Sequence, residues 1–315
     1  MFRLKLVPAN TSIPFIDWRR PAMIASLVLA LASVVLAFKP GLNFGIDFRG
    51  GILIEVQTPG PADIAGMRAQ LSGLGLGEVA LQEFGDANTV LIRVERQPGD
   101  ATAQQAAVTA VRGALDNFGG GDIDYRRVEF VGPKVSAELV EAGALAVALA
   151  VVLMLVYIWF RFEWHFGVGA VIALVHDVAL SLGMFAVTQL EFNLSTIAAL
   201  LTIVGYSIND TVVVYDRVRE NLRRYKSKPL PEVLNISIND TLSRTTMTSV
   251  TTLLALITLF LFGGAVIKGF VFAMIWGVII GTYSSIFVAA PLLIVLGLAT
   301  KHRGGEADTA SAEEA

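Results

Sequence analysis

Residues 142–160 read AGALAVALAVVLMLVYIWF, a run of nineteen residues without a charged side chain. A helix that crosses the hydrocarbon core of a bilayer needs about 20 predominantly apolar residues. Five further stretches are apolar over a similar length: residues 21–38, 166–187, 194–215, about 243–262 and 270–298. The sequence therefore predicts a polytopic α-helical membrane protein with six transmembrane helices. Pro291 should kink the last of them near its end.

The composition supports this class. Of the 315 residues, 54% are hydrophobic and 16% are charged, against about 25% charged in an average soluble protein. This balance excludes a soluble globular enzyme and a disordered chain, and a net charge of −3 gives no bulk attraction to nucleic acid. The chain has no cysteine and three histidines. We therefore expect neither a metal centre nor another cofactor.

Lysine and arginine are distributed unequally between the two sets of short connectors. Thirteen of them lie in the two chain ends, the turn after residue 160 and the stretch 216–242, whereas the opposite connectors contain only Lys268. Positive residues favour the cytoplasmic side of a membrane. Residues 1–20, the basic loop 216–242 and the tail 299–315 are therefore predicted to be cytoplasmic. Residues 39–141 should be periplasmic, in a chain that spans the bacterial inner membrane.

Residues 39–138, between the first two spans, have the pattern of a small folded domain that precedes a five-helix bundle at 139–298. Alternating apolar residues predict strands near 52–57, 79–84, 90–94 and 123–131, and helical spacing predicts two helices between them. The second helix should open with a capping box at residues 102–105. The order is β-α-β-β-α-β, which predicts a ferredoxin-like α+β domain. The domain holds no nucleophile and base pair, so we expect binding or coupling there and no enzyme activity.

Asp210 is the most informative charge in a predicted span. It belongs to the sequence GYSINDT at 205–211, and Tyr206 and Ser207 share its helix face at i−4 and i−3. An ionisable side chain costs about 2.5–3.5 kcal/mol at the centre of a spanning helix, so it persists where it has a function. A desolvated carboxylate can take up and release a proton. The alternative is a structural carboxylate that a neighbouring helix holds in place.

Three further polar features lie in the spans. The fifth span reaches full length only if it includes Arg244, which could pair with Asp210, pair with Asp240 or extend to the membrane surface. A stripe of threonines on the same helix could carry a file of water or simply pack closely: Thr241, Thr245, Thr248 and Thr252. His176 and Asp177 lie near the middle of the third span. Asp177 is the better candidate charge, and His176 is either a proton carrier or a neutral hydrogen-bonded ring.

Six motifs occur in an order that resembles the SecF branch of the SecD–SecF family of protein-export subunits, within the resistance-nodulation-division superfamily. They are GIDFRGG at 45–51, VGPKVSAEL at 131–139, HD at 176–177, GYSINDTVVVYDRVREN at 205–221, SRTTMTS at 243–249 and FGG at 262–264. Each motif alone is weak, whereas the ordered set is specific. The resemblance covers nearly the whole chain.

The resemblance implies a function and partners. It implies a lipid-embedded subunit that pairs with SecD, assists SecYEG and SecA, contacts YajC and uses the proton motive force to export unfolded polypeptide. Protons would be the coupling ion. The family's proton path falls here on Asp210 and Arg244, with Asp177 and Asn209 as further members. Ser207, Thr245, Thr248, Thr252 and His176 complete the polar path that we expect around them.

Two other functions fit the same residues. One is a proton-coupled half-transporter for a lipid or another small hydrophobic substrate, which would be recognised by the small molecule that accumulates in its absence. The other is a passive scaffold of a membrane complex. In a scaffold, neutral substitutions of Asp210, Asp177 and Arg244 would change only assembly or stability.

Overall fold

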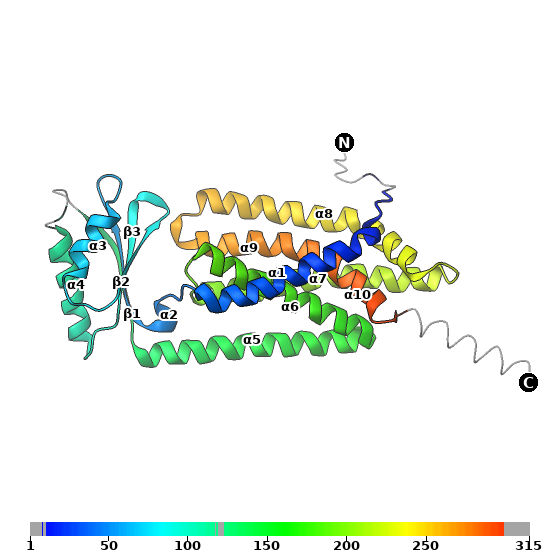
Figure 1. Cartoon of the computed structure of the whole chain (residues 1–315), viewed down its shortest axis with the longest axis horizontal. Helices are drawn as coiled ribbons and strands as arrows, with labels where there is room; N and C mark the ends of the chain where they lie inside the picture. The colour runs from blue at the N-terminus through cyan, green and yellow to red at the C-terminus, as the bar shows by residue number, and fades with distance from the viewer. Residues whose placement is uncertain (1–7, 9–10, 117, 119–122, 299–315) are drawn as a thin grey trace, which may run out of the picture.

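The computed structural model describes residues 8, 11–116, 118 and 123–298. Figure 1 shows a long helical bundle with a small α/β domain at one end, and α1 begins and α10 ends at the opposite end. The predicted tail at 299–315 and most of the first ten residues lie outside the described residues. We refer below to the sheet end and the far end of the bundle.

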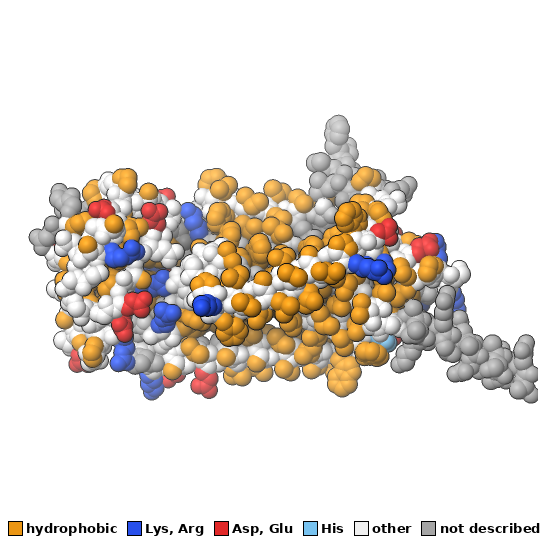
Figure 2. All heavy atoms as spheres, in the orientation of Figure 1, with side chains coloured by type: hydrophobic (Ala, Val, Ile, Leu, Met, Phe, Trp, Pro, Cys, Tyr) orange, Lys and Arg blue, Asp and Glu red, His pale blue; other side chains and the backbone are white. Residues whose placement is uncertain are grey.

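Six helices among the described residues are long and apolar enough to cross a membrane, which confirms the predicted number. Most of the bundle's visible surface is hydrophobic, and the charged side chains gather toward its two ends (Figure 2). The spanning helices are α1 (Arg19–Leu36), α5 (Pro133–Arg161), α6 (Trp164–Thr188), α7 (Leu194–Arg224), α8 (Leu230–Phe262) and α9 (Ala265–Ser284). Short helical turns flank α1: η1 (Phe15–Trp18) and η2 (Ala37–Gly41).

The last span is irregular near Pro291. A π-type turn, η3 (Ser285–Ala289), follows α9 and leads into the short helix α10 (Ala290–Val295), with Pro291 in the first turn of α10. Proline has no N–H to donate and its ring crowds the preceding turn. The irregular turn therefore precedes the position where the sequence predicts a kink.

Helices extend further than the apolar runs. The sequence predicts a loop at 216–242, but α7 continues to Arg224 and α8 starts at Leu230, so the connector is only 225–229. The reason is that buried residues continue at helical spacing beyond the apolar run, such as Val218 on α7 and Leu234 on α8. In the same way, α5 begins at Pro133, so the small domain ends near residue 132 rather than 138.

Helices α6, α7 and α9 form the inside of the bundle, and glycines bring them together. A Cβ atom on Gly277 of α9 would lie 2.2 Å from Ile203 Cγ1 of α7, and one on Gly281 would lie 3.1 Å from Ser207 Cβ. Gly183 of α6 packs equally closely on Ser33 of α1. Small residues at such contacts let two backbones approach each other.

The small domain follows the predicted β-α-β-β-α-β order. Its elements are β1 (Gly51–Gln57), α3 (Ile64–Ser72), β2 (Val79–Phe84), β3 (Asp86–Val94), α4 (Ala101–Asp116) and β4 (Asp124–Val131). The sheet order is β2-β3-β1-β4, with every pair antiparallel. Helices α3 and α4 cover one face, over a core that includes Ile54 and Ile92. Leu53 and Leu91 on the other face pack against Ile46 of the short helix α2 (Ile46–Arg49).

The start of α4 differs from the predicted capping box. The helix begins at Ala101, and the Asp100 carboxylate accepts hydrogen bonds from the backbone N–H groups of Thr102 (3.0 Å) and Ala103 (3.4 Å). An aspartate before the first turn satisfies these free donors as well as a threonine does. The N–H groups of the first turn keep the pKa of the Asp100 carboxyl below its ordinary value.

Candidate functional site

Asp177 is the centre of the polar interior of the bundle. Its carboxyl group is fully buried and is contacted from three helices. His176 Nδ1 on α6 lies 2.9 Å from one oxygen, and Ser284 Oγ on α9 donates to the other at 2.7 Å. Ser207 Oγ on α7 donates to that same oxygen. The predicted residues His176, Asp177 and Ser207 are therefore in direct contact.

His176 is buried, with one nitrogen engaged and one free of partners. Nδ1 contacts Asp177, whereas Nε2 is enclosed and has no hydrogen-bond partner in the structure. The ring also stacks on Tyr283 of α9 at 6.4 Å between centroids. A ring held in this way can fix the orientation of Asp177, which fits the hydrogen-bonded reading of the sequence.

Asp210 lies on α7, three residues beyond Ser207, and its side chain is 4% exposed. Within the part of the chain that the structure describes, its Oδ2 atom is buried without a hydrogen-bond partner, and so is Oγ1 of Thr245 on the adjacent helix α8. Thr245 and Arg244 both belong to α8, which packs against α7. The next residue, Thr211, is paired with Ser285 Oγ at 3.0 Å. Asp210 therefore keeps one carboxyl oxygen available in an enclosed position.

Arg244 does not form the expected ion pair. Asp210 and Arg244 are both described residues, and no ion pair joins them. Arg244 is exposed on α8, and Asn209 is exposed on α7 beside the buried Asp210. Two polar side chains thus lie on the outer surface of the α7–α8 pair, within segments apolar enough to span a membrane.

The threonine stripe of α8 does not form a continuous polar path. Thr241 and Thr248 donate their hydroxyl groups to carbonyls of their own helix, and Thr248 is exposed. Thr252 is half-buried. Of the four, only Thr245 is both buried and adjacent to Asp210. The stripe therefore splits into one residue at the site and three away from it.

The hydroxyl groups at the end of α9 and the start of η3 were not predicted as part of the site. Ser284 and Ser285 contact Asp177 and Thr211, and Thr282 pairs with Ser249 of α8 at 2.7 Å. Ser249 in turn accepts a hydrogen bond of 3.4 Å from Tyr206. The signal was present in the sequence TYSS at 282–285, four polar residues in the middle of an apolar span. These residues extend the polar cluster over four helices.

A second copy of the sequence SINDT occurs at 237–241 and has a different environment. Asp240 accepts a hydrogen bond of 3.0 Å from Asn221 Nδ2, which also donates to Ser237 Oγ. Asn239 Oδ1 accepts a hydrogen bond from the Ile13 N–H, and Asn239 Nδ2 donates one to the Ile13 carbonyl, at 2.9 Å each. The second copy therefore joins the far end of α8 to α7 and to the segment before α1.

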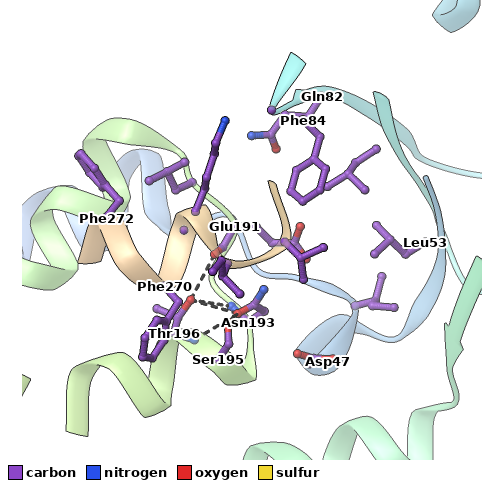
Figure 3. Close-up of a pocket in the computed structure, with 18 of the residues that line it drawn as sticks. Asp47, Leu53, Gln82, Phe84, Glu191, Asn193, Ser195, Thr196, Phe270 and Phe272 are labelled. Carbon is purple, nitrogen blue, oxygen red and sulfur yellow. Dashed lines mark hydrogen bonds between the residues drawn. The ribbon is translucent and has the colours of Figure 1, made fainter. Parts of the chain in front are cut away.

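A cavity of about 770 Å³ lies at the sheet end, between the face of the sheet opposite α3 and α4 and the connectors of the bundle. In Figure 3, Phe84 and Leu53 of the sheet lie on one side and Glu191, Asn193 and Thr196 on the other. Thr196 Oγ1 bonds the Glu191 carbonyl at 3.3 Å. Burial raises the pKa of the Glu191 carboxyl; the Arg93 charge opposes this rise and the Asp47 charge adds to it.

Within the described residues, no three His, Cys, Asp or Glu side chains gather closely enough to hold a metal ion. Asp177 contacts two hydroxyl groups and an imidazole ring, and Asp210 is buried one helical turn beyond Ser207 on α7. Such an arrangement can hold, accept or pass a proton. A buried carboxyl group with one free oxygen is the chemical feature that the site offers.

Comparison with known proteins gives a consistent result. The family model described as protein export membrane protein SecD/SecF, C-terminal, matches residues 110–299, and the SecD/SecF GG motif matches residues 35–58. A protein translocase subunit SecF from Rickettsia bellii is 46% identical over 94% of this chain and 97% of its own length. The same subunit from Rhodobacter capsulatus is 48% identical over 94% of this chain and 92% of its own.

Solved structures also match. The crystal structure of SecDF, a translocon-associated membrane protein from Thermus thermophilus, superposes with a TM-score of 0.82 at 35% identity. The match covers 92% of this chain and 39% of that one. A SecDF structure in a super-membrane-facing form gives a TM-score of 0.67 at 33% identity, over 98% of this chain and 41% of that one. The chain thus spans about two fifths of each SecDF chain.

Proposed function

The chain belongs to the SecD/SecF family of protein export membrane proteins, and on that premise we propose that it is the SecF-type subunit of a protein translocase. With a SecD-type partner, it uses the proton motive force to drive or complete the export of polypeptides across the inner membrane. The observation that carries the proposal is Asp210, a buried carboxyl group with one oxygen free of partners. In this proposal the chain has no enzyme activity. Its coupling ion is the proton, and it needs no bound cofactor.

The orientation follows from the distribution of positive charge. The far end of the bundle holds Arg161 and the basic 216–228 stretch, whereas the short connectors at the sheet end hold only Lys268. Positive residues favour the cytoplasm. The far end and both termini are therefore cytoplasmic, and the α/β domain is periplasmic. The sheet order β2-β3-β1-β4 supports a ferredoxin-like classification of that domain.

The SecD-type partner covers the outer surface of α7 and α8. Arg244 and Asn209 are exposed there. An arginine in lipid costs about 2.5–3.5 kcal/mol near the centre of a span, so a protein surface with a complementary carboxylate is the favourable neighbour. The chain covers 39% of the SecDF chain from Thermus thermophilus, so the remainder of that protein corresponds to what a partner supplies. SecYEG, SecA and YajC complete the proposed assembly.

Proton coupling needs a site whose charge differs between two conformations. Protonation of Asp210 removes a negative charge from the buried contact between α7 and α8 and lets the two helices shift relative to each other. One proton that crosses about 100 mV supplies about 2.3 kcal/mol. Ser207, three residues before Asp210, contacts Asp177 of α6, so a shift of α7 also rearranges this contact. The movement passes along α7 to its first residue, Leu194, beside the periplasmic domain.

The test compares two aspartates in the same sequence context, Asn-Asp-Thr. Asp210→Asn should abolish the part of precursor export that depends on the proton gradient and leave copurification with the partner intact. The matched control is Asp240→Asn, at the cytoplasmic end of α8, which should export normally. The measurement is translocation of a secretory precursor into inverted membrane vesicles, with and without a proton gradient. Normal export by Asp210→Asn across a full gradient would contradict the proposal, and lost assembly alone would favour a scaffold.

A further inference from the structure

The segment that joins α1 to the sheet is folded onto the connector between α6 and α7. Gly45 donates its backbone N–H to the Phe192 carbonyl at 2.9 Å, and Phe192 donates to the Asn43 carbonyl at 2.8 Å. Asn43 Nδ2 also donates to the Gln189 carbonyl at 2.8 Å. Three hydrogen bonds therefore tie residues 43–45 to the 189–193 connector, immediately before α7 begins.

Asp47 of α2 bonds to α7 itself. Its Oδ2 atom accepts a hydrogen bond of 2.8 Å from the backbone N–H of Leu194, the first residue of α7. The first N–H groups of a helix have no partner within the helix, and its N-terminus carries a partial positive charge. A carboxylate is therefore a favourable acceptor there. This cap differs from an ordinary one because it comes from a part of the chain 147 residues away.

Close packing supports these hydrogen bonds. The rings of Phe44 and Phe48 lie 5.8 and 5.9 Å from the ring of Phe192, and Phe185 of α6 lies 5.5 Å from it on another side. Gly45 also lies close to the connector, because a Cβ atom there would lie 2.4 Å from Glu191 Oε1 and the Glu191 side chain would have to move. The segment 43–48 and the 189–193 connector therefore move as one unit.

The same segment is bound to the sheet on its other side. Arg93 of β3 donates from Nη1 to Asn43 Oδ1 at 2.9 Å and to the Phe44 carbonyl at 3.0 Å. Helix α2 ends at Arg49, and only Gly50 separates it from β1. Gly51 has φ +124° and lies against the Val94 carbonyl, a position that admits only glycine. Movement of α2 is therefore passed directly to the central strands β1 and β3.

These contacts place Asp47 between the proton site and the periplasmic domain. Helix α7 is continuous from Leu194, which Asp47 caps, to Asp210 and beyond. The two positions are sixteen residues apart, roughly 24 Å along the helix axis. We infer that Asp47 is a positioning residue that transmits movement of α7 to the sheet, so that the domain follows the protonation state of the bundle. The inference rests on the proposed function and adds the residue that couples its two halves.

The test uses the complete complex in liposomes and measures one distance. The chain has no cysteine, so Gln105→Cys on α4 and Val175→Cys in the middle of α6, both exposed, give a spin-label pair. The distance should shift between the parent chain and Asp210→Asn, which mimics the protonated state. Asp47→Ala should abolish this shift. Asp47→Asn keeps an acceptor oxygen at the same place and should restore it.

The matched control is Asn193→Ala. Asn193 caps the same end of α7 from its own connector, through a hydrogen bond of 3.2 Å from the Thr196 N–H. Removing it weakens the helix end without touching α2, so the distance shift should persist. A shift that persists equally in Asp47→Ala would overturn the inference and leave the proposed function intact. If the distance is the same in the parent chain and in Asp210→Asn, both the inference and the proposed function are contradicted.

Discussion

Ser284 of α9 donates a hydrogen bond of 2.7 Å to the buried carboxyl group of Asp177 on α6. Ser207 of α7 donates to the same oxygen, so one carboxyl group joins the three inner helices. Asp210 lies outside this junction, one helical turn further along α7 and next to α8. The bundle thus separates the hydrogen-bonded carboxyl group of Asp177 from that of Asp210, whose Oδ2 atom has no hydrogen-bond partner among the described residues.

The junction predicts a stability effect. Ser284→Ala removes one donor to Asp177 and should destabilise the bundle by about 0.5–2 kcal/mol, the range of interhelical hydrogen bonds in membranes. Thr258→Ala is the matched control, because the Thr258 hydroxyl is exposed and bonds only the Leu254 carbonyl of its own helix. Thermal unfolding of the purified complex measures both. Equal loss in the two variants would show that the Asp177 junction adds nothing to stability.

The close packing of α7 against α9 leads to a second prediction about stability. Gly277→Ala places a methyl group 2.2 Å from Ile203 Cγ1, so the two helices must separate. Overpacking of this kind costs about 1–3 kcal/mol. Gly269→Ala on the same helix meets no atom within 4 Å and should leave the melting temperature unchanged or slightly higher. If Gly277→Ala melts like Gly269→Ala, the inner helices do not pack as described.

The sequence was sufficient to predict the six spanning helices but not the residues at which the helices begin and end. Runs such as residues 142–160 predicted the six spans because lipid requires apolar length and little else. The helix between 216 and 224 was missed because its residues are mostly polar, and only Val218 and Asn221 reveal the buried face. Likewise, Asp100 and Thr102 were equally good caps by residue type, and only the fold chooses between them.

The polar site was predicted in part, for a similar reason. Helical spacing places Ser207 beside Asp210, but it does not say which neighbour each side chain meets. Ser207 turned out to bond Asp177, and Arg244, expected beside Asp210, is exposed instead. The role of Asp47 depends on two segments 147 residues apart, a relation that no local pattern contains.

Glu191 predicts a pH dependence at the sheet end. Burial holds the pKa of its carboxyl above the ordinary value, so the folded protein binds this proton more tightly than the unfolded chain does. Its contribution to stability is therefore fully present below the unfolded pKa, about 4.3, and is lost as the pH rises through the folded pKa.

Glu191→Gln should flatten this dependence, because glutamine stays neutral. The measurement is the melting temperature of the complex between about pH 4 and about pH 7. Glu138→Gln, which removes an exposed carboxylate outside the cavity, should keep the parent profile. If Glu191→Gln keeps the parent slope, the Glu191 carboxyl does not titrate in this range.

The central claim is that Asp210 carries the proton that the complex uses. Proton flux through liposomes that contain the purified complex, followed with a pH-sensitive dye in the lumen, tests it most directly. We predict that Asp210→Asn abolishes the flux, whereas Asp240→Asn, in the second copy of the motif, conducts like the parent chain. Undiminished flux in Asp210→Asn, in a complex that assembles normally, would contradict the account.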